Sequence, residues 1–279
     1  MEKEDFMKPE LAEIVSVKKE TENLNTYTIS FLDKDLQKHF YFTPGQFIEL
    51  SVFGAGEAPF TFSSPPSRKH DFDITVMKAG KLTEKLFEMN KGELIGIRGP
   101  FGNGWPVSHM KDKHIVLVGG GSGFTSLYSL AQHLLEIKPF AKTLSVFYGA
   151  KTKEDFLFKE TLFGEWKNSS DISLHLAIDS PKEGWSGATG YATDLLNAEA
   201  VQFPKETIAC SCGPEGMMNA ANQKLSELGV SEERIFSSFE RLMYCGIGRC
   251  GHCMIGYRHV CIDGPIFSFK EVKEFPKET

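Results

Sequence analysis

The placement of cysteine constrains this chain more than any other sequence feature. Residues 1–209 contain no cysteine, two cysteines follow at positions 210 and 212, and the other four lie between residues 245 and 261. The N-terminal segment is acidic and lacks the apolar core of a signal peptide, so we expect a cytoplasmic protein whose thiols stay reduced. Metal ligation or reactivity is therefore expected of these cysteines rather than disulfide bonding. The crowding of four of them predicts a small C-terminal module.

The four clustered cysteines, Cys245, Cys250, Cys253 and Cys261, follow the spacing C-x4-C-x2-C-x7-C. A 2Fe–2S cluster needs four thiolates around two irons, and the first three cysteines repeat the C-x4-C-x2-C loop of plant-type ferredoxins. Glycines between them suit a tight loop whose amides point at the cluster sulfurs. Structural zinc is the alternative, although zinc sites usually contain two separated C-x2-C pairs and this chain has one; inert thiols are a third possibility. The spacing predicts a 2Fe–2S cluster, with His252 beside it or facing solvent rather than ligating.

Length and charge limit the remaining possibilities. The 279 residues suggest about two larger domains, and 41% hydrophobic residues allow a sizeable core. The 31 basic and 37 acidic residues give a net charge of −6, which argues against nucleic-acid binding, and 12% aromatic residues argue against disorder. No apolar run approaches the roughly 20 residues that cross a bilayer, so no membrane insertion is expected.

The chain changes its pattern at about residue 111. Short β-branched or aromatic runs between residues 11 and 98, separated by turn signals, predict a small antiparallel barrel. Strands are then expected at 114–118, 143–150, 172–178 and 206–213, and helices at 126–138, 153–166 and 214–229. Strands that alternate with helices predict a doubly wound parallel sheet. The expected division is 1–108, 109–235 and 236–279.

A glycine-rich turn, residues 119–123, follows the first strand of the α/β region. Glycines let the chain turn tightly and let a pyrophosphate approach the helix N-terminus, which makes Gly120, Gly121, Ser122 and Gly123 candidate phosphate-binding residues. Taken alone, a G-G-G-x-G run is a weak signal, because a plain strand–helix turn also uses glycine. The preceding strand and the following helix strengthen it.

These features together resemble the ferredoxin–NADP reductase superfamily over nearly the whole chain. The family has a flavin-binding barrel followed by a pyridine-nucleotide domain. The segment A-P-F-T-F-S-S at 58–64 occupies the place of the family's flavin motif R-x-Y-[ST], and G-K-L-T at 80–83 matches its second flavin segment. Further matches are the turn at 99–102, the nucleotide loop at 119–123, the strand and helix at 148–150 and 155–158, and the C-G-P motif at 212–214.

The resemblance implies FAD and NAD(H) as cofactors and assigns their contacts. FAD would be bound by Pro59, Phe60, Thr61, Phe62, Ser63, Gly80, Lys81, Leu82 and Thr83. NAD(H) would be bound by Gly120, Gly121, Ser122, Gly123, Gly213 and Pro214, with Cys212 beside the nicotinamide as the catalytic position. Ala58 and Phe60 replace the motif's arginine and tyrosine, so a charge-assisted bond to the diphosphate is lost. Cys212 has a second interpretation as a small buried hydrophobic residue, and Cys210 is expected in the core.

The choice of nucleotide is indicated by Asp179. This acidic residue follows the strand at 172–178 without an arginine nearby, and Lys182 is flanked by Glu183. An acidic group near the ribose favours NAD, so NADH is expected over NADPH, with NADP(H) as the alternative. Lys151 and Lys153 are expected to be solvated, with contact to a nucleotide phosphate as the alternative.

The C-terminal cysteines narrow the resemblance to electron-transfer subunits of multi-subunit redox enzymes. The x7 gap, G-E-A-P at 56–59 and C-I-D-G-P-I-F at 261–267 resemble the electron-transfer subunit of anaerobic sulfite reductase most. The hydrogenase gamma subunit and the dihydroorotate dehydrogenase electron-transfer subunit are the alternatives. Nicotinamide delivers a hydride and an iron–sulfur cluster accepts single electrons, whereas flavin handles both, so the order NADH → FAD → 2Fe–2S → partner follows.

The expected partners are the iron–sulfur and catalytic subunits of a redox complex, because the chain shows no siroheme or nickel ligands. Arg249, His252, Tyr257 and Arg258 are expected on the docking face, with ordinary solvated surface as the alternative. Two other functions stay open: a self-contained NAD(P)H:ferredoxin-type reductase, and a zinc-stabilised nucleotide-binding adaptor without enzymatic activity.

Overall fold

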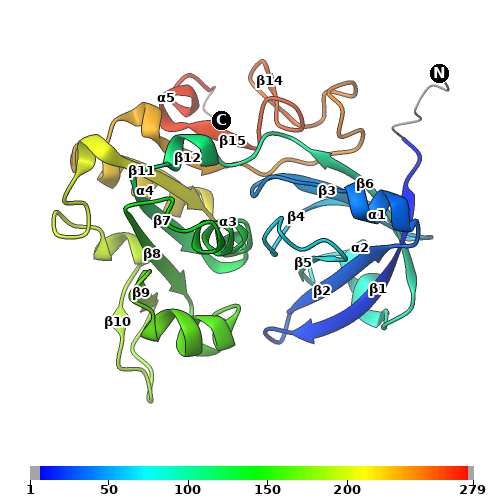
Figure 1. The fold of residues 1–279 in the computed structure, drawn as a ribbon, viewed down its shortest axis with the longest axis horizontal. Coiled ribbons are helices and arrows are strands. Elements are labelled where there is room, and N and C mark those ends of the chain that lie inside the picture. The colour runs from blue at the N-terminus through cyan, green and yellow to red at the C-terminus, as the bar shows by residue number, and fades with distance from the viewer. Residues whose placement is uncertain (1–6, 276–279) are drawn as a thin grey trace.

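The computed structural model describes residues 7–275, and its first part is an antiparallel sheet (Figure 1). The strand order is β4-β3-β6-β1-β2-β5. The strands are β1 (Glu10–Lys19), β2 (Leu24–Phe31), β3 (Phe47–Val52), β4 (Gly56–Thr61), β5 (Phe72–Met77) and β6 (Leu94–Phe101), with helices α1 (Lys34–His39) and α2 (Lys81–Glu88). Alternate β-branched and aromatic side chains point to one buried core, which contains Ile14, Ile29 and Ile48. The predicted antiparallel barrel is confirmed.

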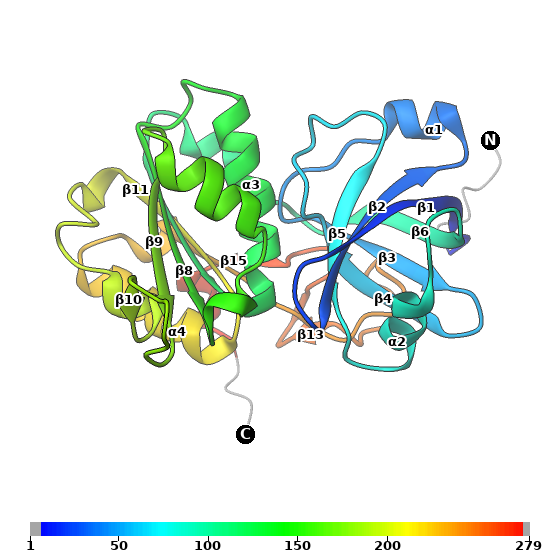
Figure 2. The same ribbon diagram turned by 90° about the horizontal axis from the view of Figure 1, so that it is seen from below.

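The second part is a seven-stranded sheet with the order β10-β9-β8-β7-β11-β12-β15. Its elements are β7 (His114–Gly120), α3 (Phe124–Glu136), β8 (Thr143–Ala150), β9 (Ser173–Ile178), β10 (Ala188–Thr189), β11 (Thr207–Cys212), α4 (Glu215–Glu227), β12 (Ile235–Ser238) and β15 (Ile266–Ser268). All neighbouring strands are parallel except β12 and β15. Helix α3 packs with Leu117 on one face and α4 packs with Val116 on the other (Figure 2). The predicted doubly wound sheet is confirmed.

Shorter elements connect these strands. Single-turn helices lie at Val107–Met110, Gly121–Gly123, Lys153–Asp155, Trp166–Asn168, Ala192–Leu195, Pro204–Glu206 and Glu232–Arg234, with a π-helical turn at Thr161–Glu165. The C-terminal segment contributes β13 (Met254–Ile255), β14 (Arg258–His259) and α5 (Phe269–Val272).

The helix predicted over 153–166 is wrong for its first half. Phe156 is extended and Phe158 has a φ of 53°, so the chain leaves the helical region after Asp155. The aromatic side chains are buried against the sheet, and the Phe158 amide donates to the Glu20 carboxylate of the barrel at 3.0 Å. Packing between distant residues therefore overrides the local helical pattern.

The C-terminal segment packs against both larger parts. Cys253 and Cys261 lie in one hydrophobic cluster with Phe47 of β3 and Phe101 of β6, on the barrel face opposite its core. Strand β15 adds an antiparallel edge to the nucleotide-type sheet beside β12. In Figure 1 the loops around β14 accordingly lie above β3 and β6. The predicted boundary between residues 235 and 236 falls inside β12.

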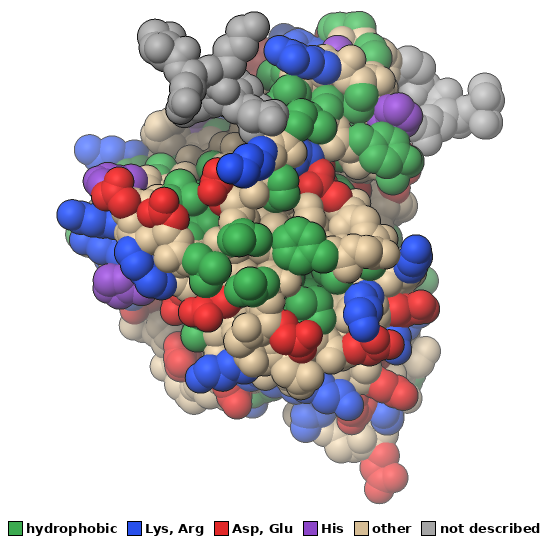
Figure 3. All heavy atoms as spheres, turned by 90° about the vertical axis from the view of Figure 1, so that its right-hand side faces the viewer, with side chains coloured by type: hydrophobic (Ala, Val, Ile, Leu, Met, Phe, Trp, Pro, Cys, Tyr) green, Lys and Arg blue, Asp and Glu red, His purple; other side chains and the backbone are tan. Residues whose placement is uncertain are grey.

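The molecular surface mixes both signs of charge on the face shown in Figure 3. Lysine and arginine side chains alternate there with aspartate and glutamate around a central group of hydrophobic side chains. Within residues 7–275, no helix is both long and apolar enough to cross a membrane.

Candidate cofactor sites

The topology of the seven-stranded sheet marks one edge as a ligand site. From β7 the chain adds β8, β9 and β10 on one side and then returns to place β11 on the other side. Ligands of open α/β sheets bind outside the carboxyl ends of the strands at such a reversal. Gly119 of β7 lies opposite Cys212 of β11 at this point. The predicted nucleotide loop and the C-G-P motif therefore start side by side.

Backbone packing joins these two motifs directly. A Cβ atom on Gly123 would lie 2.5 Å from the Cα atom of Gly213, and one on Gly213 would lie 2.8 Å from the carbonyl oxygen of Gly120. Gly213 also has a φ of 150°, which side chains rarely allow. Ser122 is half-buried and its carbonyl closes the turn, whereas a Cβ on Gly121 would meet nothing within 4 Å. The loop is therefore tight on its inner side and open on its outer side. Pro214 is exposed and starts α4.

Cys212 presents a neutral thiol at this edge. It is 5% exposed, its thiol is hydrogen-bonded to Ser238, and burial raises its pKa to about 12. At neutral pH the thiol keeps its proton, so it can pack and donate a hydrogen bond but cannot act as a base. Cys210 is fully buried in the same hydrophobic cluster, which confirms its expected core position.

The flavin motif has half-buried residues in β4 and a fully buried residue directly after this strand. Pro59, Phe60 and Thr61 are half-buried, and the Thr61 hydroxyl donates to the Gln46 carbonyl at 3.1 Å. Phe62 is fully buried and stacks on Phe42 with the ring centroids 3.7 Å apart. The structure thus places Phe62 in the barrel core.

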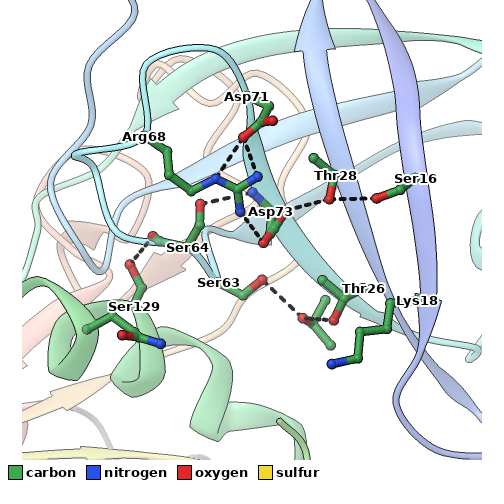
Figure 4. Close-up of polar contacts among 12 residues, drawn as sticks. Ser16, Lys18, Thr26, Thr28, Ser63, Ser64, Arg68, Asp71, Asp73 and Ser129 are labelled. Atoms are coloured by element: carbon green, nitrogen blue, oxygen red, sulfur yellow. Dashed lines mark hydrogen bonds and ion pairs between the residues drawn. The ribbon is translucent and has the colours of Figure 1, made fainter. Parts of the chain in front are cut away.

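Ser63 and Ser64 belong to a polar network that reaches the second domain (Figure 4). The Thr75 hydroxyl donates to Ser63 at 3.0 Å and lies 2.8 Å from the hydroxyl of Thr26. Ser129 of α3 donates to the Ser64 carbonyl at 2.6 Å. This network fixes the end of the motif against the nucleotide-type domain.

An arginine does lie near the motif, but it is engaged elsewhere. Arg68 forms ion pairs with Asp71 and Asp73, which neutralise its guanidinium (Figure 4). The two carboxylates therefore oppose any role for Arg68 as a replacement for the arginine missing at position 58.

The second flavin segment opens helix α2. Gly80 is the N-cap residue and provides no side-chain cap, and a Cβ there would meet nothing within 4 Å. Lys81 is exposed, Leu82 packs against the barrel core, and Thr83 donates to the Gly80 carbonyl at 2.9 Å. Amides of the first helical turn that lack a side-chain cap attract anions. The diphosphate of a flavin nucleotide fits this position.

The cysteine loop arranges its thiols in two pairs. The sulfurs of Cys253 and Cys261 are 3.3 Å apart, and the Cys245 side chain lies close enough to Cys250 to lower the pKa of its thiol. Among the described residues, no three His, Cys, Asp or Glu side chains surround a single point as for one metal ion. Three of the thiols are buried and Cys250 is exposed.

Backbone amides of the loop point at these sulfurs. Cys245 Sγ accepts hydrogen bonds from the amides of Ile247 at 3.5 Å and Arg249 at 3.3 Å, and Cys261 Sγ accepts one from Gly248 at 3.2 Å. Such N–H···S bonds favour negative charge on sulfur. Amides also lower the pKa of Cys250, whereas burial and the neighbouring Cys253 thiol raise the pKa of Cys261 to about 12. Thiols this crowded ionise together when cations bind them, so the loop fits an iron–sulfur cluster.

The expected docking residues differ in exposure. Arg249, His252 and Tyr257 are exposed, and the His252 ring meets Tyr244 edge-on at 4.4 Å. Arg258 is half-buried, with Asp263 at 3.6 Å and Glu271 at 3.8 Å. The cysteine loop is therefore exposed to solvent at Cys250 and at the neighbouring residues Arg249 and His252.

The residues expected to select the nucleotide lie beyond β8 and β9. Asp179 is exposed and its amide donates to the Ala150 carbonyl at 3.1 Å. Lys182 Nζ lies 2.6 Å from Glu154 Oε2 in an ion pair, so the Glu154 carboxylate would compete with a nucleotide phosphate for the Lys182 ammonium. Lys151 and Lys153 are both exposed.

Sequence patterns missed a group of charges between barrel and cysteine loop. Glu49 of β3 is 0% exposed, and neither of its carboxyl oxygens has a hydrogen-bond partner in the described part of the chain. Arg98 of β6 is its cross-strand neighbour and pairs with Glu57 of β4. A lone glutamate in the apolar run Q-F-I-E-L-S-V was the available signal.

Glu49 predicts a specific pH dependence of stability. Burial, and then the charge of Glu57, raise its pKa from 4.5 to about 8. The folded protein thus holds this proton more tightly than the unfolded chain, so stability falls as pH rises from about 4.5 to 8. A change of one in pKa corresponds to about 1.4 kcal/mol, which makes the effect one of several kcal/mol at most. Glu49→Gln removes the ionisation, so its stability relative to wild type should increase between pH 5 and pH 8, measured by denaturant unfolding. A difference in unfolding free energy between Glu49→Gln and wild type that stays constant from pH 5 to pH 8 would contradict the raised pKa.

Comparison with known proteins agrees with this division of the chain. Residues 13–105 match an oxidoreductase FAD-binding domain, residues 117–223 an oxidoreductase NAD-binding domain, and residues 240–273 the iron–sulfur cluster binding domain of dihydroorotate dehydrogenase B. The sulfhydrogenase 2 gamma subunit of Pyrococcus furiosus is 32% identical over 92% of this chain and 94% of its own length. A probable dihydroorotate dehydrogenase B electron-transfer subunit of Methanocella arvoryzae is 35% identical over 94% and 91%.

Among solved structures, a chain of an NADH-dependent reduced ferredoxin–NADP oxidoreductase has a TM-score of 0.74 and 26% identity, covering 93% of this chain and 88% of its own. The matches to separate FAD-binding, NAD-binding and iron–sulfur domains make this chain an oxidoreductase. It belongs to the ferredoxin–NADP reductase superfamily, in the family of flavin- and nicotinamide-dependent electron-transfer subunits that includes hydrogenase gamma subunits and the electron-transfer subunits of dihydroorotate dehydrogenase B.

Proposed function

We propose that this protein oxidises NADH and delivers the electrons through FAD and a 2Fe–2S cluster to a catalytic partner subunit. The observation that carries the proposal is the packing of the paired-thiol loop directly on the flavin-type barrel, with Cys253 and Cys261 in the same hydrophobic cluster as Phe47 and Phe101. Electron transfer needs its centres close together, and one chain here holds all three sites. Segments 1–108, 109–235 and 236–279 would serve flavin, nucleotide and cluster respectively.

Separate groups of residues would bind the flavin and the nicotinamide. Half-buried Pro59, Phe60 and Thr61 would border the flavin ring, and the first-turn amides of α2 would hold its diphosphate. The flavin held there would supply the conversion of a two-electron hydride into single electrons. The open glycine loop and Gly213 would orient the nicotinamide beside the protonated Cys212 thiol.

The cluster would be held by the two thiol pairs, one pair for each iron. The pairing of Cys253 with Cys261 and of Cys245 with Cys250 supports a two-iron cluster over a single zinc ion. Exposure of Cys250 supports electron exit on that side. A cytoplasmic location, where thiols stay reduced, belongs to the same proposal.

For the partner, we propose the catalytic subunit of an anaerobic sulfite reductase, on the motifs at 56–59 and 261–267. A hydrogenase is the second candidate, because the sulfhydrogenase gamma subunit is 32% identical over 92% of this chain. A tagged chain purified anaerobically from its native host should carry FAD, released by acid and identified by chromatography, and should retain its partner subunits. The complex should reduce sulfite with NADH. Hydrogen formation without sulfite reduction would favour the second candidate, and absence of flavin and iron would refute the proposed function.

Nucleotide preference provides a separate prediction. Asp179 is exposed beyond β9, where its negative charge would repel the 2′-phosphate of NADPH, and Lys182 is already ion-paired with Glu154. We expect kcat/KM for NADH to exceed that for NADPH in flavin reduction. Asp179→Asn should narrow the difference. A higher kcat/KM for NADPH in the wild-type protein would overturn this assignment.

A further inference from the structure

Arg98 lies buried between the barrel and the cysteine loop. Its side chain is 2% exposed and donates hydrogen bonds to the carbonyls of Tyr244 at 2.9 Å and Cys245 at 2.8 Å. The same guanidinium pairs with Glu57, the residue directly before the flavin motif. One buried cation therefore contacts both the flavin-motif strand and the backbone of the first cluster cysteine.

A neutral residue anchors the other end of the loop. The Asn103 side chain donates to the carbonyls of Asp263 at 2.9 Å and Ile266 at 2.8 Å, and it accepts from the Ile266 amide at 2.9 Å. The loop is thus tied to the barrel at both ends, just before Cys245 and just after Cys261. Arg98 carries a positive charge and Asn103 is neutral. Substitutions of the two residues can therefore distinguish a structural effect on the loop from an electrostatic effect on it.

The charge of Arg98 has a direct consequence for a cluster held by this loop. Reduction adds one negative charge, and cluster potentials respond to net charge and to hydrogen bonds around the sulfurs. A buried positive charge next to Cys245 stabilises that added charge, and its effect is large where water is excluded. Glu57 opposes it, as does Glu49 whenever that cross-strand neighbour is ionised.

We propose that Arg98 is a positioning residue that ties the cluster loop to the barrel, and that its charge, balanced by Glu57, sets the reduction potential of the cluster. This inference rests on the proposed function, because it requires a cluster at the four cysteines. It concerns a group that touches no cofactor and acts through the backbone of Cys245.

The test is a redox titration of the purified protein, followed by the EPR signal of the reduced cluster. In Arg98→Gln we expect the ratio of reduced to oxidised cluster, at the wild-type midpoint, to fall roughly tenfold, equal to about 59 mV for a one-electron couple. Arg98→Lys keeps the charge and should retain most of the wild-type potential. Asn103→Ser, the matched control, loosens the opposite anchor without a charge change and should leave the potential in place.

A second variant reverses the sign. Glu57→Gln removes the carboxylate that opposes the guanidinium and leaves Arg98 and its bonds to Tyr244 and Cys245, so the same ratio should rise roughly tenfold. An unchanged potential, or shifts in the same direction for both variants, overturns the proposal. Loss of iron from both variants also overturns it, because the contacts would then be structural only. Wild-type protein that binds no iron would instead refute the proposed function.

Discussion

Cys253→Ser is expected to abolish the EPR signal of the reduced cluster and to remove most of the bound iron, while FAD stays bound. Cys253 is buried with its sulfur 3.3 Å from that of Cys261, so a serine there breaks one of the two thiol pairs. The barrel core and the first turn of α2 are remote from this pair in the sequence and keep their own contacts. Iron content, flavin content and EPR of the dithionite-reduced protein measure the result.

A cysteine outside the loop provides the control for this substitution. Cys210→Ala also changes a buried cysteine, but its site is the core of the nucleotide-type domain. It should keep iron and the EPR signal, with only a modest loss of stability. Iron content unchanged in Cys253→Ser would mean that the four cysteines do not hold the metal.

Gly213→Ala should slow flavin reduction by NADH roughly 100-fold, because even a small misplacement of the reacting groups costs about that much. The new Cβ would lie 2.8 Å from the Gly120 carbonyl oxygen, on a residue with a φ of 150°. The glycine loop and the C-G-P motif must then separate. Stopped-flow bleaching of the flavin measures the rate, and dithionite should still reduce both FAD and cluster.

Gly216→Ala is the matched control in the same helix entry. A Cβ on Gly216 would meet nothing within 4 Å, and alanine suits a helix better than glycine. The NADH rate should stay at the wild-type value. Equal rates in Gly213→Ala and wild type would show that the contact between the two motifs does not shape the nicotinamide site.

Local patterns predicted the parts of this structure that depend on local chemistry. Continuous apolar runs predicted β7 and β11, since parallel strands that are buried on both faces consist mainly of hydrophobic residues. The resemblance to the reductase superfamily predicts that the glycine loop and the C-G-P motif bind one nucleotide, and the structure shows the contact between Gly123 and Gly213.

Features that depend on contacts between distant residues could not be predicted from the sequence. The chain from Phe156 to Phe158 follows its packing and the bond to Glu20 rather than its helical pattern. The contacts among Glu57, Arg98 and Cys245 join three separate segments, and no spacing rule links them. The edge strand β15 likewise depends on where the cysteine loop returns.

The most direct test of the electron path compares flavin-loaded with flavin-free protein. Both are mixed anaerobically with NADH, and the EPR signal of the reduced cluster is followed, with dithionite as the positive control in each. Our account predicts that dithionite reduces the cluster in both, whereas NADH reduces it only in the flavin-loaded protein and only after the flavin has bleached. Reduction of the cluster by NADH in flavin-free protein, or a cluster that stays oxidised beside a fully bleached flavin, would contradict it.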